Sequence, residues 1–349
     1  MTEAHATSAR NSFTEHPQPA REVFLNLNES PFGMHASVMQ AAAESLAGAG
    51  RYQFDLVGRL RKAIAATHGV PEEWVSLYPG SNRALHYATL AFTGAQAPLV
   101  VATPGYPICE QTARLVERPV HQVALLENGE HDVDAMGEAG RSGLIYIANP
   151  NNPTGTLTSR SALQRLLRNL RPETHVLIDE AYLEFCDERS MLADIHDHPR
   201  LIVTRTFSKI HGMAGLRLGY AVAQPQTINH MHTMPPQDVS VPAAAAGLVC
   251  LTQDAVVSER KALIAAQRDH LKAWLAERDL PCTPSQSNCL MIDCRRPADQ
   301  VISQLASRGV HVGRSWPEMP NWIRITVGNS EEMHALCNAL GHTLGLTCD

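Results

Sequence analysis

The sequence predicts an α/β protein, with a large domain built on a mostly parallel sheet and a smaller α+β domain after it. Short apolar runs alternate with amphipathic stretches through the middle of the chain, and this pattern changes after Tyr220. The 349 residues are about twice the length of one average domain, so both parts can have a core of their own.

Four apolar runs lack polar alternation, which is typical of strands buried on both faces. They lie at Pro98–Ala102, Leu144–Ala148, Val176–Ile178 and Leu201–Thr204. Between the second and third runs, Ser159–Leu170 carries leucines at helical spacing, with Thr158 or Ser159 as the N-cap. Strand, helix and strand in this order predict a parallel sheet covered by helices.

The last third of the chain predicts a separate α+β domain. Its expected helices are Asp254–Asp279, Val301–Arg308 and one that begins with a capping box at Asn329–Glu332, and its expected strands are Cys289–Ile292 and Trp322–Val327. We therefore divide the chain into an N-terminal arm (1–33), a large domain (34–245) and a small domain (246–349).

Composition excludes several classes of protein. Lysine and arginine total 29 against 35 acidic residues, a net charge of −6, so the basic excess needed for nucleic acid is absent. No apolar run reaches the length of a membrane-spanning helix, about 18 residues. Met1–Gln18 has no apolar run behind a basic cluster, and no G-x-G-x-x-G occurs. We expect a cytoplasmic protein that binds neither membranes nor dinucleotides.

Cysteine and histidine spacing favours no metal site. The eight cysteines include no C-x-x-C and are expected to be reduced and mostly buried. His196-x-His198 and His230-x-His232 have no third ligand at a recognisable spacing.

Polar residues follow three of the predicted strands directly. Asn149–Gly155 (NPNNPTG) follows the second run, Asp179–Tyr182 (DEAY) the third, and Arg205–Lys209 (RTFSK) the fourth. Ligands of open α/β sheets bind beyond the carboxyl ends of the strands. One edge of the sheet is therefore expected to collect an amide, a carboxylate, a phenol, hydroxyls and a lysine.

Together these motifs resemble the pyridoxal-phosphate enzymes of fold type I, and within them the histidinol-phosphate aminotransferase branch of the class I/II aminotransferases. The resemblance runs from about Leu25 to the end of the chain. The motifs, in order, are Asn26–Gly33, Pro150–Gly155, Asp179–Phe185, Ser208–Lys209 through Ala214–Arg217, and Arg324–Gly328.

The resemblance implies roles around a pyridoxal 5'-phosphate ring. Lys209 is expected to form the Schiff base, and Asp179 to pair with the pyridine nitrogen, where a carboxylate keeps the ring protonated as an electron sink. Asn152 and Tyr182 are expected to donate to the phenolic oxygen, and Tyr106 to stack on the ring.

The resemblance also implies where the anionic groups bind. The cofactor phosphate is expected at Gly80–Asn82, just before a helix that runs from Arg83 towards Phe92, because backbone N–H groups at a helix start bind anions. Its expected side chains are Ser81, Asn82, Thr206, Ser208 and Arg217, together with Tyr52 from the second subunit of a homodimer. Arg324 is expected to bind the α-carboxylate of the substrate, supported by Asn28.

Three segments depart from the family pattern. Ser12–Pro19 lacks the tyrosine that the family has in this region, and His211 replaces an aromatic residue. His211 either faces the substrate or packs, and we expect packing. The loop Gln237–Ser240 is more acidic than usual. We therefore expect a free amino acid whose basic or imidazole side chain meets Asp238 to be at least as good a donor as histidinol phosphate.

The expected activity is transfer of an amino group between an amino acid, or an amine like histidinol phosphate, and a 2-oxo acid. The same cofactor also serves decarboxylases and oxidases, here acting on a basic amino acid, because the pocket selects which bond breaks. A ligand-sensing regulator is disfavoured, because we expect no DNA-binding domain in the short segment before Arg21.

Overall fold

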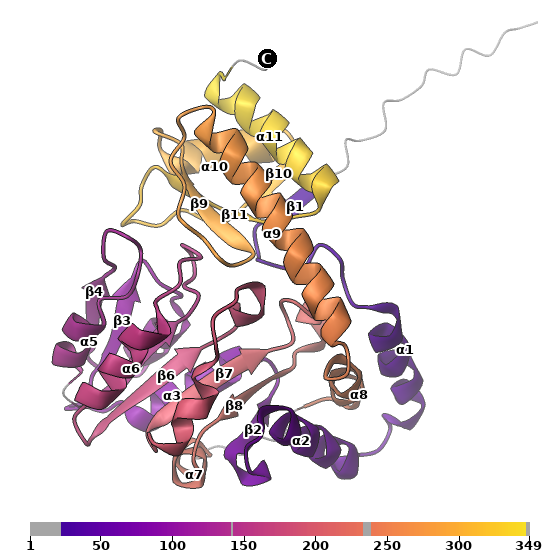
Figure 1. Ribbon diagram of the computed structural model, residues 1–349, viewed down its shortest axis with the longest axis vertical. Helices are drawn as coiled ribbons and strands as arrows, with labels where there is room; N and C mark the ends of the chain where they lie inside the picture. The colour runs from indigo at the N-terminus through magenta and orange to yellow at the C-terminus, as the bar shows by residue number, and fades with distance from the viewer. Residues whose placement is uncertain (1–21, 141, 233–238, 347–349) are drawn as a thin grey trace, which may run out of the picture.

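The structure is a computed structural model that describes residues 22–140, 142–232 and 239–346. Within these residues the large domain contains a seven-stranded sheet (Figure 1). Its strands, in spatial order, are β2 (Val75–Tyr78), β8 (Gly219–Val222), β7 (Leu201–Thr206), β6 (Thr174–Asp179), β5 (Gly143–Ala148), β3 (Leu99–Thr103) and β4 (Val120–Ala124). The strands from β7 to β4 are parallel, and β8 is antiparallel to both of its neighbours.

Helices cover both faces of this sheet, so its central strands are apolar on both sides. One face packs against α1 (Ala36–Ser45), α2 (Phe54–His68), α5 (Val133–Ala139), α6 (Arg160–Asn169) and α8 (Val241–Cys250). The other packs against α3 (Ser81–Phe92), α4 (Ile108–Leu115) and α7 (Pro225–Met231). Short 3-10 turns lie at Leu46–Gly48, Glu72–Trp74, Leu183–Phe185, Met191–His196 and Ala214–Leu216.

The small domain has its own core and two short sheets. β9 (Cys289–Asp293) pairs antiparallel with β11 (Trp322–Thr326), and β1 (Val23–Leu25) pairs parallel with β10 (Val310–Val312). The helices α9 (Asp254–Ala276), α10 (Ala298–Ala306) and α11 (Ser330–Leu344) pack in the same core. α9 begins near α8 and extends up into the small domain (Figure 1).

The predicted fold class is confirmed, and most predicted elements lie within three residues of the expected bounds. Ser159 is the N-cap of α6, where its side chain accepts the N–H of Ala162. The capping box at Asn329 and Glu332 is also present. The helix expected at Val301 begins at Ala298, because Pro297 can cap a helix without needing an N–H partner.

Sequence patterns missed the elements that depend most on tertiary contacts. The apolar helix α8 has no polar face that would reveal its period, and Ala243, Ala244 and Cys250 are buried in the core of the large domain. The division expected at 245/246 falls inside this helix, and the strand β1 of the arm pairs within the small domain. The boundaries of the three expected segments stay predictions.

Among the described residues, no single helix is long and apolar enough to cross a membrane; α8 and α9 pass that test only as a pair bent by 83°.

Candidate active site

A cavity of about 400 Å³ lies beyond the carboxyl ends of β5, β6 and β7 and is also lined by residues of the N-terminal segment and of β11. Its lining includes every residue that the resemblance assigns to the cofactor or the substrate carboxylate except Tyr52: Asn28, Ser81, Asn82, Tyr106, Asn152, Asp179, Tyr182, Thr206, Ser208, Lys209, Arg217 and Arg324. Segments about 300 residues apart therefore meet at one place, and the strand-end residues among them lie where the rule for open α/β sheets predicts a ligand site.

Asp179 is the last residue of β6 and its carboxylate is buried. Thr204 Oγ1 donates to its Oδ1 at 3.0 Å, and the Tyr146 hydroxyl donates to its Oδ2 at 3.4 Å. Burial raises the pKa of Asp179 to about 6, partly opposed by these hydrogen bonds. A buried carboxylate whose hydrogen-bond donors are all neutral is costly, and a cationic N–H would offset that cost. The site therefore suits a protonated ring nitrogen.

Lys209 is the third residue after the end of β7, and its Nζ donates to the backbone oxygen of Leu27 at 3.1 Å. The same nitrogen lies 5.4 Å from the centre of the Tyr182 ring. Burial, and then the charge of Arg324, lower the pKa of Lys209 to about 8. An amine with this pKa is partly neutral near pH 7.5, which is the state that attacks a carbonyl carbon.

The Tyr182 hydroxyl accepts hydrogen bonds from two amides. Asn28 Nδ2 lies 3.1 Å from it and Asn152 Nδ2 lies 3.3 Å from it. Burial raises the pKa of Tyr182 well above its usual value, so the phenol keeps its hydrogen. Since both contacts use the oxygen as acceptor, the hydroxyl hydrogen is free to point to an acceptor in the cavity.

Arg324 projects from β11 into the same cavity. One terminal nitrogen donates to Asn152 Oδ1 at 2.9 Å, and the other donates to the backbone oxygen of Asn26. Its Nε is buried and has no hydrogen-bond partner among the described residues. The guanidinium carbon lies 5.3 Å from the centre of the Trp316 ring, and that of Arg314 lies 4.7 Å from the same ring. An arginine with an unused donor suits an anionic group.

The other end of the cavity is a cradle of hydrogen-bond donors at the start of α3. Gly80 has a φ of 85°, and a Cβ there would lie 2.3 Å from a terminal nitrogen of Arg217. Arg217 donates to Ser208 Oγ at 3.3 Å, and Ser208 Oγ accepts from Thr206 Oγ1 at 2.9 Å. Free N–H groups at the helix start, hydroxyls and a guanidinium together suit a phosphate. Tyr106, whose hydroxyl donates to Asn82 Oδ1 at 3.2 Å, lines the cavity between this cradle and Asp179.

Comparisons with known proteins identify the family. The family model for aminotransferase class I and II matches residues 21–340. The histidinol-phosphate aminotransferase of Symbiobacterium thermophilum is 33% identical over 93% of this chain and 91% of its own, and histidinol-phosphate aminotransferase 2 of Ralstonia nicotianae is 34% identical over 94% and 90%. The chain belongs to the class I and II aminotransferases.

Solved structures agree with the assignment of the chain to the aminotransferase family. The histidinol-phosphate aminotransferase of Sinorhizobium meliloti, solved in complex with pyridoxal-5'-phosphate, has a TM-score of 0.86 and 25% identity, covering 93% of this chain and 92% of its own. The L-threonine-O-3-phosphate decarboxylase of Porphyromonas gingivalis shares the fold, with a TM-score of 0.81 at 23% identity over 93% and 99%. The enzyme is a pyridoxal-phosphate-dependent aminotransferase, and the donor set described above fits that cofactor.

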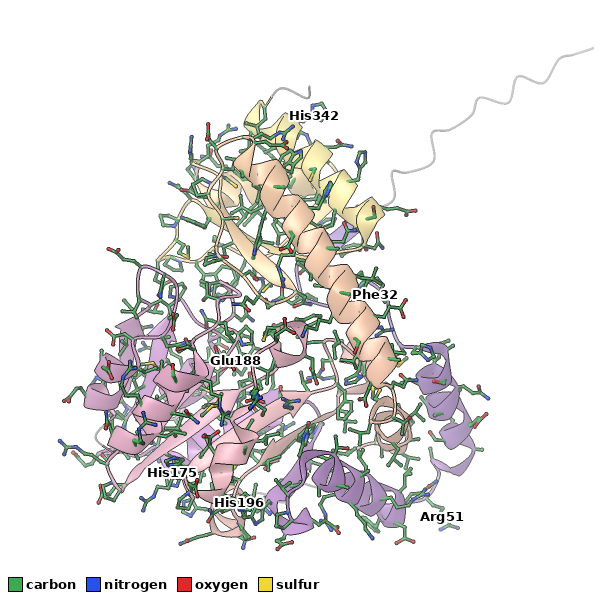
Figure 2. All side chains as sticks on the ribbon, viewed as in Figure 1. Phe32, Arg51, His175, Glu188, His196 and His342 are labelled. Carbon is green, nitrogen blue, oxygen red and sulfur yellow. The ribbon has the colours of Figure 1, made fainter. Side chains whose placement is uncertain are left out.

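Tyr52 lies away from the cavity of its own chain. Its side chain is 89% exposed and stacks on Phe54, with 5.6 Å between ring centres. It lines a second, larger cavity of about 1190 Å³ with residues of α2, β2 and the segment before α8. Figure 2 labels its neighbour Arg51 beside α1 and α2. The expected role of Tyr52 in a second subunit stays a prediction.

His211 lies outside the cavity lining of the aminotransferase. Its ring centre is 5.2 Å from that of Phe207, and its Nε2 is 4.0 Å from a carboxylate oxygen of Glu184. Burial lowers the pKa of His211 to about 4, which keeps the ring neutral and packed. Ser12–Pro19 and Asp238, on which the expectation of a basic amino acid rested, lie outside the described residues.

The sequence patterns missed several residues at the donor end of the cavity. Leu27 and Glu29 line the cavity and belong to the motif Asn26–Gly33, in which the resemblance gives a role only to Asn28. Trp316 belongs to no motif, and its contact with Arg324 follows from the pairing of distant segments. The small lining residues Ala148, Ala181, Ala214 and Gly215 carry no chemical signal.

Proposed function

We propose that this aminotransferase transfers the amino group of histidinol phosphate to a 2-oxo acid. The observation that carries this proposal is the pair of guanidinium groups around one indole, Arg314 and Arg324 at Trp316. Two cations that pack against the same indole, Arg324 in the cavity lining and the exposed Arg314, suit a phosphate better than a single carboxylate, because a phosphate carries close to two negative charges near pH 7. The names of the relatives from Symbiobacterium and Ralstonia support the same donor.

At the cofactor end, each side chain has one task. Bound pyridoxal phosphate supplies the electron sink that makes the α-carbon of the donor acidic. Asp179 holds a proton at the ring nitrogen, and Asn152 and Tyr182 donate to the phenolic oxygen. Tyr106, which lines the same cavity, would stack on the face of the ring. Lys209 binds the cofactor and moves the proton of the donor's α-carbon, a task that suits an amine with a pKa of about 8.

The cradle at α3 holds the cofactor phosphate in this proposal, through Ser81, Asn82, Thr206, Ser208 and Arg217. Borohydride reduction of the cofactor-loaded protein should attach the cofactor irreversibly to Lys209, and peptide mapping will locate the adduct. An adduct on another lysine would contradict the assignment of Lys209.

The donor is tested by comparing kcat/KM for histidinol phosphate, histidine, arginine and the aromatic amino acids with 2-oxoglutarate as acceptor. We expect histidinol phosphate to exceed every free amino acid by at least about 100-fold, because a phosphate can pair with Arg314 in addition to Arg324, and one further hydrogen bond between charged groups is worth about 1.5 to 3 kcal/mol. The competing expectation, a free amino acid with a basic or imidazole side chain, is supported if histidine or arginine is equal or better. Decarboxylated or oxidised products would instead support another reaction of the same cofactor.

We also propose a homodimer in which Tyr52 reaches the cofactor phosphate of the partner. The exposure of Tyr52 and Phe54 beside an open cavity supports a second copy as the partner of this surface. Mixing Tyr52→Ala and Lys209→Ala subunits should restore activity, because the mixed dimer has one site with both native residues. If the mixture is no more active than its components, Tyr52 does not act across an interface.

The reducing cytoplasm is the proposed location. The described cysteines are free thiols and most are buried, which suits that compartment.

A further inference from the structure

Glu29 places a carboxylate at the donor end of the cavity. The residue is exposed, and it lines the cavity beside Leu27 and Asn28. Within the part of the chain that the structure describes, its carboxylate makes no hydrogen bond and no ion pair. The Leu27 backbone oxygen, two residues before it, lies 3.1 Å from Lys209 Nζ. The free carboxylate therefore belongs to a segment in direct contact with the reacting amine.

Glu29 is the charged side chain of the cavity lining that has no partner in the proposed function. Five charged side chains of the described residues line it: Glu29, Asp179, Lys209, Arg217 and Arg324. In the proposed function, Asp179, Lys209 and Arg217 meet the cofactor and Arg324 meets the anionic group of the donor. The charge of Glu29 acts on the same space, since it raises the pKa of Lys209 against the larger effects of burial and Arg324. A positively charged or N–H-bearing group of the donor is the missing partner.

The backbone around Glu29 is held in place from both sides. Asn28 has a φ of 53°, a left-handed conformation that asparagine tolerates, and its N–H donates to Thr326 Oγ1 at 2.9 Å. Asn288 Nδ2 donates to the backbone oxygens of Asn28 and Glu29 at 3.1 and 3.4 Å. This fixed backbone limits where the carboxylate can go, which favours selection of one donor geometry over general attraction.

We infer that Glu29 is a specificity-determining residue that accepts a hydrogen bond from the imidazole of the donor's side chain. Leu27, which is 62% exposed, offers apolar surface for the ring face beside that acceptor. An imidazole combines an apolar face with a ring N–H, and it carries a positive charge when protonated. The inference rests on the proposed function and extends it from the anionic end of the donor to the opposite end.

The test compares imidazole donors with phenyl donors of the same shape. The donor pairs are histidinol phosphate with phenylalaninol phosphate, and histidine with phenylalanine. In the Glu29→Gln variant, the ratio of kcat/KM for imidazole over phenyl should fall by about 10- to 100-fold, as expected for a lost hydrogen bond to a charged group. The value for the phenyl donors should change by less than about 3-fold. Glu29→Asp should restore part of the ratio.

A matched control removes another carboxylate near this region without touching the cavity lining. Glu318 accepts a hydrogen bond from Thr103 Oγ1 at 2.9 Å, and Glu318→Gln should leave the imidazole-to-phenyl ratio unchanged. Binding provides a second readout: calorimetry with 3-(imidazol-4-yl)propyl phosphate, which has no amine to transfer, should show the same loss of affinity in Glu29→Gln holoenzyme. The phenylpropyl phosphate should bind both proteins equally.

The two proposals fail in different ways. If no imidazole donor reacts with the native enzyme, the proposed function is wrong. If imidazole donors react and bind normally, and Glu29→Gln leaves their advantage over phenyl donors unchanged, the function stands and the role of Glu29 is wrong. A higher kcat/KM for lysine or arginine than for the imidazole donors in the native enzyme would also overturn the imidazole inference. It would mean that Glu29 selects a longer basic side chain.

Discussion

The two ends of the cavity are built differently. The cofactor end comes mainly from the carboxyl ends of neighbouring strands and from the start of α3, so residues close to strand ends in the sequence meet there. The donor end joins Leu27–Glu29 of the N-terminal segment to Arg324 of the small domain, about 300 residues later. The first is fixed by a rigid sheet, whereas the second depends on how two domains and a segment come together.

This difference suggests that the cofactor end carries out the reaction, whereas the donor end selects the amine. In the proposed function, the sheet end holds the groups that bind the cofactor and activate its ring, which other reactions of the same cofactor also need. The donor end holds Glu29 and Arg324, whose charges can distinguish one amine from another. Substitutions at the two ends should therefore affect different measurable quantities.

The largest effect is expected at the cofactor end. Asp179→Asn keeps the shape of the side chain but removes the charge that holds the ring nitrogen protonated. Turnover should fall by at least about 1000-fold with the cofactor still bound. Steady-state kinetics and the visible absorption of the bound cofactor measure the two quantities. Near-normal turnover would mean that the carboxylate is only structural.

Although Asp179→Asn should lower turnover, it should raise the stability of the cofactor-free protein. Burial raises the pKa of Asp179 from 3.8 to about 6, so the folded state holds more protons than the unfolded state between these values. The stability of the native protein should therefore fall as pH rises from about 4 to 6, by about 3 kcal/mol in total, and stay reduced above that. Urea unfolding should find cofactor-free Asp179→Asn about 3 kcal/mol more stable than native at about pH 7.5, with the difference lost near pH 4. Equal stabilities at both pH values would exclude this cost.

At the donor end, Arg324→Ala should lower kcat/KM by about 2 to 3 kcal/mol, or about 30- to 150-fold, by removing a charge-assisted pair with the anionic group of the donor. KM should rise and cofactor affinity should remain within a few-fold of native. If cofactor affinity falls as much as kcat/KM does, the two ends are not separable and the comparison breaks down.

A smaller effect is expected from Gly80→Ala in the phosphate cradle. The added Cβ would displace the Arg217 guanidinium, and the φ of 85° is unfavourable for alanine. Cofactor affinity should fall by about 10- to 30-fold, as for one weakened hydrogen bond to a charged group. Gly309→Ala after α10 is the matched control, because its φ of 77° is equally unfavourable for alanine and nothing lies within 4 Å of its added Cβ. Affinity losses of equal size in both variants would mean that the cradle is not the cause.

The sequence predicts the cofactor end of the cavity better than the donor end. Asp179 and Lys209 could be placed because each comes directly after an apolar run, and parallel strands bring their carboxyl ends together. Glu29 and Trp316 could not be given roles, because their neighbours belong to distant segments and no local pattern encodes that pairing. The edge strand β4 was missed because half-exposed residues hide its period, and α8 because alanine runs carry almost no amphipathic signal.

In the proposed function, Asn28 would couple the absorption of the bound cofactor to the position of the small domain. Its side chain donates to Tyr182 in the large domain, while its own oxygen accepts from Thr326 in the small domain at 3.1 Å. Any turn of the small domain would change the distance from Asn28 to the Tyr182 hydroxyl and, through it, the donor that faces the phenolic oxygen. Absorption of the bound cofactor would then shift when an anion binds Arg324, even an anion that cannot react. A spectrophotometer could follow domain movement in this protein without any added label.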